Sequence, residues 1–402
     1  MDTAAEKTSP AVAAGQAGHS LPAWVYRNPE FLELERKTLF MPAWHLVCHQ
    51  SDIPNKGDYQ TFRMLGEIVF AVRGKDGGIK AFHNVCRHRA ARLLDDGKGN
   101  CGGTLTCPYH AWSYALDGRL VGVPFKNQYD ALKEESYNLR PVETRLCMGF
   151  VFINLRPGNM EPEDMLAPAA PELAHYNIEQ MQPLGKGRVT ERRVAVNWKQ
   201  GTDNYVDALH VRAAHPGLDS LVGDSYDLRD LGHGVSRLSG RIEQVAGAGL
   251  SVRAYREILP NMEYLPKDYR RSWLYFMISP SLALNLYPDC VEFMQFLPLD
   301  GTHCVVREGV YGHPDTRREV KLARYLNLRV NRQVGIEDRA LISRVQDGMG
   351  SSSFTTGPLG RNEICLRRFA ESLRKLIPVS RLEQEPVTGM VAGINQKMLE
   401  RT

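Results

Sequence analysis

The sequence predicts an α+β protein, with a small all-β domain followed by a larger domain whose central antiparallel sheet is flanked by helices. Three observations support this class. Short strand-like runs separated by glycine-containing turns fill residues 42–156 with little helical periodicity. After residue 187, apolar strand-like runs alternate with helical periodicity. The length of 402 residues suits two domains.

The composition excludes several classes of protein. Hydrophobic residues make up 43% and charged residues 24%, so the chain is neither wholly disordered nor collagen-like. A net charge of +4 over this length predicts no strong attraction to nucleic acid or to an anionic membrane. No apolar run approaches the roughly 18 residues of a membrane span, and the first residues lack the apolar region of a secretory signal. We therefore expect a cytoplasmic protein with mostly reduced or metal-bound cysteines.

Residues 1–41 are expected to form an N-terminal arm and a helix that pack on the larger domain. The first 20 residues read as a mobile arm. Helical spacing of apolar side chains predicts a helix over 29–41. The all-β domain then covers 42–158, with examples of its strands at 66–74 and 148–155.

Residues 159–402 are expected to form the larger domain. The proline- and acid-rich stretch 156–168 predicts a linker that leads into a helix. The predicted strand-like runs are 187–199, 272–288, 291–299 and 303–312, and the predicted helices lie near 200–213, 316–347 and 362–376.

Two short segments of the all-β domain each pair a cysteine with a histidine. CRHR supplies Cys86 and His88, and CPYHAW supplies Cys107 and His110. Two thiolates and two imidazoles form a ligand set for a soft or borderline metal. Structural zinc fingers usually supply two cysteines and then two histidines, whereas a Rieske centre needs two cysteines on one iron and two histidines on the other. The order Cys, His, Cys, His therefore favours a [2Fe–2S] cluster, with a zinc ribbon as the alternative. Cys101 fits neither pair.

A second constellation lies in the larger domain, in the stretch NWKQGTDNYVDALHVRAAHPGL (197–218). Asp207 and His210 are three residues apart and are expected to share one helix face. His215 is five residues after His210, and Pro216 follows at once, so we expect the helix to end there and His215 to swing back. Two imidazoles and one carboxylate form the facial triad that holds non-heme Fe(II). The alternative is two ordinary histidines.

These segments resemble the Rieske non-heme iron ring-hydroxylating oxygenases, in their catalytic alpha subunits. CRHR, CPYHAW and the following SYALDGRL (113–120) look like the Rieske domain of that family. Residues 197–218 are similar to its iron-binding stretch, with two departures: Asp203 stands where the family usually has Glu, and Leu209 where it usually has an aromatic residue. Neither position is a ligand in the family.

The resemblance also implies the third iron ligand and the role of Asp207. The segment GIEDRALISRVQDGM (335–349) looks like the family's C-terminal ligand region. Asp338 is the expected ligand, with Glu337 as the alternative and Asp347 as a third choice. In the family, the residue at the position of Asp207 links a cluster histidine to an iron histidine across a subunit interface, which implies an electron relay within a homotrimer.

The same resemblance implies the partners. A separate NAD(P)H-dependent reductase, or a ferredoxin, would supply electrons, and O2 and a small molecule would be the substrates. No Rossmann glycine pattern follows a strand here, so the nicotinamide site is expected on the partner. Whether a beta subunit is present stays open.

The substrate expected from the resemblance is a quaternary ammonium compound such as a betaine, carnitine or choline, which would be hydroxylated or N-demethylated. The alternative is ring hydroxylation of an aromatic acid. A cationic substrate favours an aromatic cage, for which the candidates are Tyr205, Trp273, Tyr275, Phe276, Tyr287, Phe293 and Phe296. Strand alternation should send Tyr275 and Phe276 to opposite faces. An aromatic acid would need a cation near its carboxylate, and Arg212 and Arg253 are the candidates.

Overall fold

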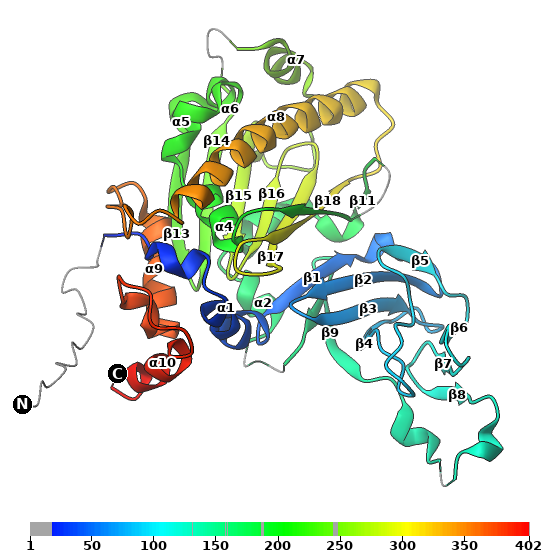
Figure 1. The fold of residues 1–402 in the computed structure, drawn as a ribbon. Coiled ribbons are helices and arrows are strands. Elements are labelled where there is room, and N and C mark those ends of the chain that lie inside the picture. Colours follow the sequence, from blue (N-terminus) through cyan, green and yellow to red (C-terminus); the bar gives the residue numbers. More distant parts are fainter. Residues whose placement is uncertain are drawn as a thin grey trace, which may run out of the picture.

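The structure is a computed structural model that describes residues 18–130, 132–156, 158, 160–185, 189–243 and 248–401. Most of the predicted mobile arm, residues 1–17, lies outside the described residues. Figure 1 shows an all-β part, in blue and cyan, beside a larger part in which helices cover a sheet. The predicted α+β class is therefore confirmed.

The all-β part is built from ten short strands within the described residues. They are β1 (Trp44–His49), β2 (Asp58–Met64), β3 (Glu67–Arg73), β4 (Ile79–His83), β5 (Lys98–Asn100), β6 (Thr104–Thr106), β7 (Ser113–Ala115), β8 (Leu120–Gly122), β9 (Pro141–Cys147) and β10 (Phe150–Asn154). Seven of them form a sheet in the order β1-β10-β9-β4-β3-β2-β5, and β6-β7-β8 form a smaller one. Strands β3 and β10 confirm the two strands predicted in this region.

The larger part is built around an antiparallel sheet of eight described strands. They are β11 (Gln182–Pro183), β12 (Thr190–Val194), β13 (Asp227–Gly232), β14 (Val235–Arg241), β15 (Ser272–Ile278), β16 (Leu282–Leu286), β17 (Val291–Pro298) and β18 (Cys304–Gly312). Their order is β11-β18-β17-β16-β15-β14-β13, and β12 also pairs with β18. The run predicted at 272–288 forms a hairpin of two strands, β15 and β16.

The two faces of this sheet pack against different layers. Phe276 belongs to a core that includes Phe150 of β10, whereas its neighbour Tyr275 belongs to a core that includes Tyr255 and Ala323. The predicted separation of Tyr275 and Phe276 is confirmed, because successive residues of a strand point to opposite faces. Side chains on the Tyr275 face therefore meet α7 (Leu250–Ile258) and α8 (Arg318–Gly348), and we call this the helix-facing side.

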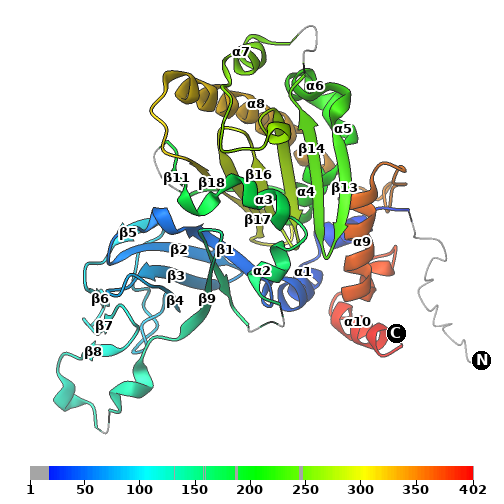
Figure 2. The same cartoon turned by 180° about the vertical axis from the view of Figure 1, so that it is seen from behind.

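Ten α-helices lie within the described residues. They are α1 (Pro29–Glu35), α2 (Pro162–Leu166), α3 (Ala170–Leu173), α4 (Trp198–Val206), α5 (Leu209–Ala214), α6 (Pro216–Val222), α7 (Leu250–Ile258), α8 (Arg318–Gly348), α9 (Ile364–Leu376) and α10 (Val391–Leu399). Figure 1 shows α8 crossing one face of the sheet, and Figure 2 shows α3 on the other side. Helices α8 and α9 confirm the helices predicted at 316–347 and 362–376.

Two sequence predictions near α4 are wrong in detail. The strand predicted at 187–199 ends at Val194, because the side chain of Asn197 accepts a hydrogen bond from the backbone N–H of Lys199 (3.0 Å) and caps a helix there. The helix predicted near 200–213 is broken, since Asp207 is in extended conformation with φ −88° and ψ 115°. A new helix, α5, starts at Leu209.

The N-terminal segment packs on the larger part. The side chain of Asn28 accepts a hydrogen bond from the N–H of Phe31 (2.8 Å) and so caps α1, which continues as a π-helical turn over Arg36–Phe40. Trp24 and Phe31 are buried in a core that includes Leu373 of α9 and Val391 of α10. This segment therefore packs against the C-terminal helices α9 and α10.

A buried arginine fixes the two parts against each other. Arg307 of β18 is fully buried and donates hydrogen bonds to the carbonyl oxygens of Leu46 (2.7 Å) and Val47 (2.8 Å) in β1. Its charge is matched by Glu191 of β12, whose carboxylate accepts from Nε at 3.0 Å. A buried cation needs such a complete set of partners, so this contact specifies one orientation of the two sheets.

None of the helices in the described residues combines the length and the apolar character that a bilayer crossing would require.

Candidate metal centres

The four predicted cluster ligands lie on two loops with the same backbone pattern. In the first, the N–H of Cys86 donates to the carbonyl of Ala91 (2.8 Å), and the N–H of Ala90 donates to the carbonyl of Cys86 (3.1 Å). In the second, Cys107 donates to Trp112 (2.8 Å) and Ala111 to Cys107 (3.0 Å). Each loop closes through an alanine at positive φ, 56° at residue 90 and 57° at residue 111. Two equivalent turns therefore present the two Cys/His pairs.

The side chains of these loops point toward one another. The rings of His88 and His110 lie 4.7 Å apart, and His88 stacks on Trp112 at 4.9 Å. Burial raises the pKa of the Cys86 thiol, and neighbouring Cys107 raises it further. Nδ1 of His88 is buried, and no hydrogen-bond partner for it lies among the described atoms. Two adjacent thiols and an unpartnered imidazole nitrogen fit a metal cluster, since buried polar atoms normally have partners.

The arrangement suits two irons better than one zinc. Around a single tetrahedral zinc, four ligand atoms at about 2.0–2.3 Å from the ion would all lie within roughly 4 Å of one another. In the described part of the chain, no three ligand atoms of Cys86, His88, Cys107 and His110 lie within 4.8 Å of one another, whereas those of a different group do. Ligands divided between two irons can be further apart, as in a Rieske cluster.

That other group is His210, His215 and Asp338, whose ligand atoms all lie within 4.8 Å of one another. His210 is on α5, His215 stands between α5 and α6, and Asp338 is on α8. The predicted end of the helix before His215 is confirmed, since α5 ends at Ala214 and Pro216 starts α6. Two imidazoles and one carboxylate on one side of a site fit the facial triad of non-heme iron.

Charges and hydrogen bonds hold the triad together. Nε2 of His215 lies 2.9 Å from Oδ1 of Asp338, and Nε2 of His210 lies 3.5 Å from the same oxygen. Asn204 of α4 donates to that oxygen at 2.8 Å. Burial would raise the pKa of Asp338, but the hydrogen bonds from both histidines and Asn204 hold it well below its usual range. Burial would lower the pKa of His210, but Asp207 and Asp338 raise it to about 9.

The two alternatives to Asp338 lie in different places. Oε2 of Glu337 accepts a hydrogen bond from Nδ1 of His215 at 2.8 Å, the ring nitrogen that faces away from Asp338. A carboxylate in this position orients the ring and fixes which nitrogen is free for a metal. Asp347 is exposed, near the C-terminal end of α8. The geometry thus separates Asp338, which converges with both histidines, from Glu337, which supports one of them.

Asp207 contacts His210, but not on a shared helix face as the spacing predicted. It lies in the break between α4 and α5, where its Oδ1 accepts from the N–H of Leu209 (2.8 Å) and its Oδ2 lies 3.2 Å from Nδ1 of His210. Burial would raise the pKa of Asp207, but the contacts with His210 and the Leu209 N–H lower it. The break keeps this carboxylate beside the ring and at the surface, with its side chain 23% exposed.

The two positions that depart from the family pattern face different surroundings. Asp203 is in the interior, where the hydroxyl of Tyr26 donates to its Oδ2 at 2.5 Å and burial raises its pKa to about 7. Leu209 is half exposed. Asp203 therefore joins α4 to the N-terminal segment, which the sequence alone did not indicate.

Four of the seven proposed cage residues lie together on the helix-facing side of the sheet. Ring centroids are 6.3 Å apart for Tyr205 and Tyr275, 6.0 Å for Tyr275 and Tyr287, and 4.6 Å for Trp273 and Tyr287. Tyr226, which sequence reasoning missed, joins them at 6.4 Å from Tyr275. We call these five side chains the aromatic cluster.

The other three candidates pack elsewhere. Phe276 and Phe293 belong to the core on the opposite face, and Phe296 packs in a core with Trp198. The aromatic cluster adjoins the triad through α4, where Asn204 donates to Asp338 and its neighbour Tyr205 belongs to the cluster. Accordingly, the charge of Asp338 contributes to raising the pKa of Tyr226 and of Tyr275, after burial.

Sequence reasoning also missed three polar residues of this region: Asn204, Asn285 and Glu292. Asn285 accepts from the hydroxyl of Tyr205 (2.5 Å) and donates to Glu292 (3.0 Å). A polar residue in a strand of buried apolar residues was the available signal, as in LALNL and VEFMQFLP.

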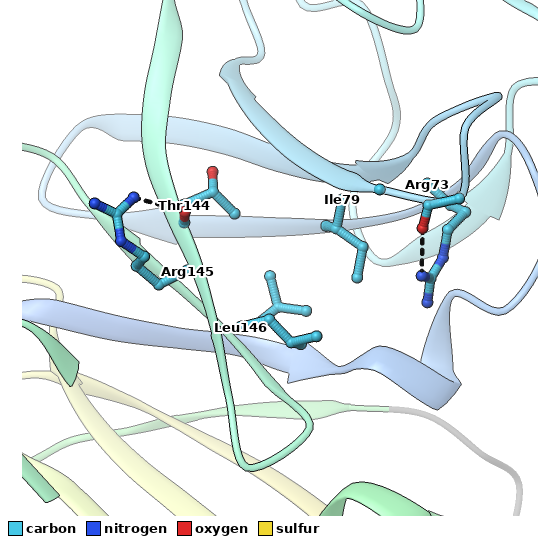
Figure 3. Close-up of a pocket in the computed structure, with 8 residues that line it drawn as sticks. Arg73, Ile79, Thr144, Arg145 and Leu146 are labelled. Atoms are coloured by element: carbon cyan, nitrogen blue, oxygen red, sulfur yellow. Dashed lines mark hydrogen bonds between the residues drawn. The ribbon is translucent and has the colours of Figure 1, made fainter. Parts of the chain in front are cut away.

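A separate pocket lies on the all-β part, away from these sites. Figure 3 shows Arg73 and Ile79 on one side of it and Thr144, Arg145 and Leu146 on the other. It contains none of the predicted cluster or iron ligands.

Comparison with known families matches both parts of the chain. Residues 43–138 match the Rieske [2Fe-2S] domain, and residues 178–378 match the ring hydroxylating alpha subunit (catalytic domain). The carnitine monooxygenase oxygenase subunit of Escherichia coli (strain K12) is 36% identical over 215 residues, which cover 52% of this chain and 56% of the relative. The glycine betaine monooxygenase oxygenase subunit of Chromohalobacter salexigens is 36% identical over 218 residues, covering 54% and 47%. The chain thus spans about half the length of the curated relatives it matches.

A solved structure has the same fold over nearly its whole length. The quaternary ammonium Rieske monooxygenase CntA, in complex with its substrate L-carnitine, superimposes with a TM-score of 0.74 at 24% identity, covering 91% of this chain and 97% of that one.

Proposed function

Because the chain belongs to the family of ring-hydroxylating alpha subunits and carries a Rieske domain, we propose that it is the terminal oxygenase component of a Rieske oxygenase system. The observation that carries this proposal is the convergence of His210, His215 and Asp338 within 4.8 Å beside an aromatic cluster. Electrons would come from NAD(P)H through a separate reductase or ferredoxin. As in the sequence prediction, the location would be the cytoplasm, where the described cysteines, all unpaired, would stay reduced.

The residues of this chain have distinct proposed roles. Cys86, His88, Cys107 and His110 would hold the [2Fe–2S] cluster, and His210, His215 and Asp338 would hold the mononuclear iron. The iron, when bound and reduced, supplies the activation of O2. Asn204 keeps Asp338 ionised and oriented, and Glu337 holds Nδ1 of His215 so that Nε2 faces the site. The aromatic cluster would exclude water from the substrate.

We propose a homotrimer in which Asp207 connects centres of neighbouring protomers. Within one chain, the loops that carry the cluster ligands lie at the opposite end of the molecule from α5, as both views show (Figures 1 and 2). Electron transfer within one protomer would have to cross that separation. Asp207 is partly exposed and contacts His210, so its carboxylate is available to a histidine of an adjacent chain.

For the substrate, we propose a quaternary ammonium compound. The reaction would insert one oxygen atom of O2 into an N-methyl C–H bond, while two electrons and two protons reduce the other oxygen to water. The resulting N-hydroxymethyl group would leave as formaldehyde. The relatives named above act on carnitine and glycine betaine, and CntA binds L-carnitine. The alternative, an aromatic acid, has less support because both arginines proposed for its carboxylate, Arg212 and Arg253, are exposed.

The test is a substrate panel with the iron-loaded oxygenase and a Rieske reductase. Glycine betaine, L-carnitine, γ-butyrobetaine and choline are compared with benzoate and anthranilate for O2 consumption and for product. With a quaternary ammonium substrate, we expect one molecule of formaldehyde to be released for each O2 consumed. Ring-hydroxylated products from the aromatic acids alone would overturn the substrate proposal but leave the oxygenase proposal in place.

A further inference from the structure

Glu292 is an acidic side chain on the helix-facing side of the central sheet. In the antiparallel register, Tyr275 of β15 lies opposite Asn285 of β16, and Asn285 lies opposite Glu292 of β17. These three side chains form a row across the sheet, on the face that carries the aromatic cluster. Tyr287 of β16 is two residues from Asn285 on the same face.

Glu292 has hydrogen-bond donors but no cation beside it. Asn285 Nδ2 donates to its Oε2 at 3.0 Å, and a hydrogen bond from Tyr287 also favours its ionised form. Over the described ranges, no lysine, arginine or histidine lies within ion-pair distance of this carboxylate. Among the other buried carboxylates that the structure describes, Glu35 is paired with Lys199 at 2.7 Å, whereas Asp52 and Asp289 accept from tyrosine hydroxyls and have no ion pair.

The lack of a cation makes the ionised form of Glu292 costly. Burial raises the pKa of Glu292 to about 7, with Glu308 adding to the effect. The ionised form therefore costs free energy in the ligand-free protein, and a cation placed beside it would recover that cost. What distinguishes Glu292 from Asp52 and Asp289 is its position beside the aromatic cluster, where a positively charged ligand could be held.

The surroundings of Glu292 match the shape of one cation in particular. Tyr205 and Tyr287 lie beside Tyr275 of this row, and aromatic faces attract quaternary ammonium groups, which have no N–H to donate. A primary ammonium or a guanidinium would need several acceptors, and Asn285 already uses its oxygen for the Tyr205 hydroxyl. The row therefore suits a methylated ammonium.

We infer that Glu292 is a specificity-determining residue, whose carboxylate balances the ammonium charge of the substrate within the aromatic cluster. This inference rests on the proposed function, because it assigns a role within the same substrate site. Tyr205 connects the ammonium site to the iron site, since it adjoins Asn204, the residue that donates to Asp338.

The experiment compares charged ligands with neutral copies of the same shape. Dissociation constants are measured by calorimetry on the iron-loaded oxygenase for glycine betaine and γ-butyrobetaine. Their carbon isosteres, 3,3-dimethylbutanoate and 5,5-dimethylhexanoate, replace the nitrogen by an uncharged carbon. The variant Glu292→Gln keeps the side-chain volume and can still accept from Asn285. The control Glu308→Gln removes a carboxylate from the neighbouring strand, where Arg192 pairs with it at 3.0 Å.

We expect Glu292→Gln to weaken binding of the better betaine by about 30-fold or more, as for removal of one partner of a desolvated charge pair. Binding of the neutral isostere should change less than about twofold. At pH 8, where Glu292 is mostly ionised with or without Glu308, the control Glu308→Gln should leave both constants nearly unchanged. Cluster absorbance and iron content confirm folding. If Glu292→Gln does not fold, Glu292→Asp should fold and show an intermediate loss.

Three outcomes would overturn the inference. Equal betaine affinity in the wild-type protein and Glu292→Gln removes the role of Glu292 but leaves the proposed function intact. An equal loss for betaine and isostere assigns Glu292 to pocket structure rather than to charge recognition. Failure of the wild-type protein to bind either betaine removes the proposed substrate class, and the inference with it.

Discussion

The loops proposed to hold the cluster and the proposed iron triad bring their side chains together in opposite ways. Each cluster loop spans six residues and is closed by its own backbone hydrogen bonds, so its Cys/His pair depends on local geometry. The triad joins His210 and His215 to Asp338 of α8, more than 120 residues later. It depends on how α4, α5 and α8 pack. One proposed centre is therefore encoded by short-range sequence and the other by the tertiary fold.

The largest effects should come from removing one ligand in each region. His110→Ala should lose the visible absorbance and the reduced-state EPR signal of the cluster while keeping the mononuclear iron. Asp338→Ala should lose the mononuclear iron and keep the cluster spectrum. Both variants should lower turnover by about 100-fold or more. Mutation of a residue that only supports a metal ligand already lowers metal affinity or activity by about 10–100-fold. Loss of cluster signal in Asp338→Ala would contradict the independence of the two regions.

The second prediction concerns the packing that holds α4. Lys199 and Glu35 form a fully buried ion pair at 2.7 Å, in which Glu35 also accepts from Nε1 of Trp198 (3.0 Å). Lys199→Met leaves an unpaired buried carboxylate and should destabilise the larger domain by about 3–5 kcal/mol. Chemical denaturation monitors the unfolding, and iron affinity should fall with it.

A double variant separates packing from charge in this pair. Lys199→Met with Glu35→Gln removes both charges and should recover most of the lost stability, because replacing a buried pair is often neutral. The cluster spectrum should stay unchanged in both variants at low denaturant. If the cluster spectrum disappeared at a lower denaturant concentration than the bound mononuclear iron, the all-β domain would be the less stable region.

The same contrast explains what the sequence could predict. The Cys/His pairs, the end of the helix at His215 and the alternation of Tyr275 and Phe276 all follow from local chain geometry. The start of α4 at Asn197 and the break after α4 at Asp207 were both missed, because helical spacing reveals neither side-chain capping nor a residue in extended conformation. Glu337 and Asp338 could not be separated by spacing, since both are on α8 and only packing decides which one meets both histidines. Tyr226 and Glu292 were missed for the same reason, as their cross-strand and cross-layer neighbours are distant in sequence.

The third prediction tests whether Glu337 supports the triad without being a ligand. Glu337→Gln removes the negative charge that holds Nδ1–H of His215. We expect iron affinity to fall about 10–100-fold, as for other second carboxylates behind metal-binding histidines. The iron content should be restored by raising the iron concentration, which would not rescue Asp338→Ala. A variant that cannot be reloaded would make Glu337 a ligand and contradict the geometry.

The smallest expected effect is the pH dependence of substrate binding, which belongs to the catalytic region and not to the cluster loops. Burial raises the pKa of Glu292 to about 7, so this carboxyl is mostly neutral at pH 6 and mostly ionised at pH 8. Only the ionised form attracts a cation, so the dissociation constant of a betaine should fall by about tenfold between pH 6 and pH 8.

Few other groups around Glu292 can produce this change. Those that face it are Tyr205 on α4, Tyr275 on β15, Tyr287 on β16, Cys290 before β17 and Glu308 on β18. Burial raises the pKa of the three tyrosines and of Cys290 well above the ordinary values, so they stay neutral in this range. Glu308 is paired with Arg192. In Glu292→Gln the dissociation constant should therefore be flat between pH 6 and pH 8. A tenfold change that persists in this variant would assign the titration to another group and separate the pH response from the ammonium site.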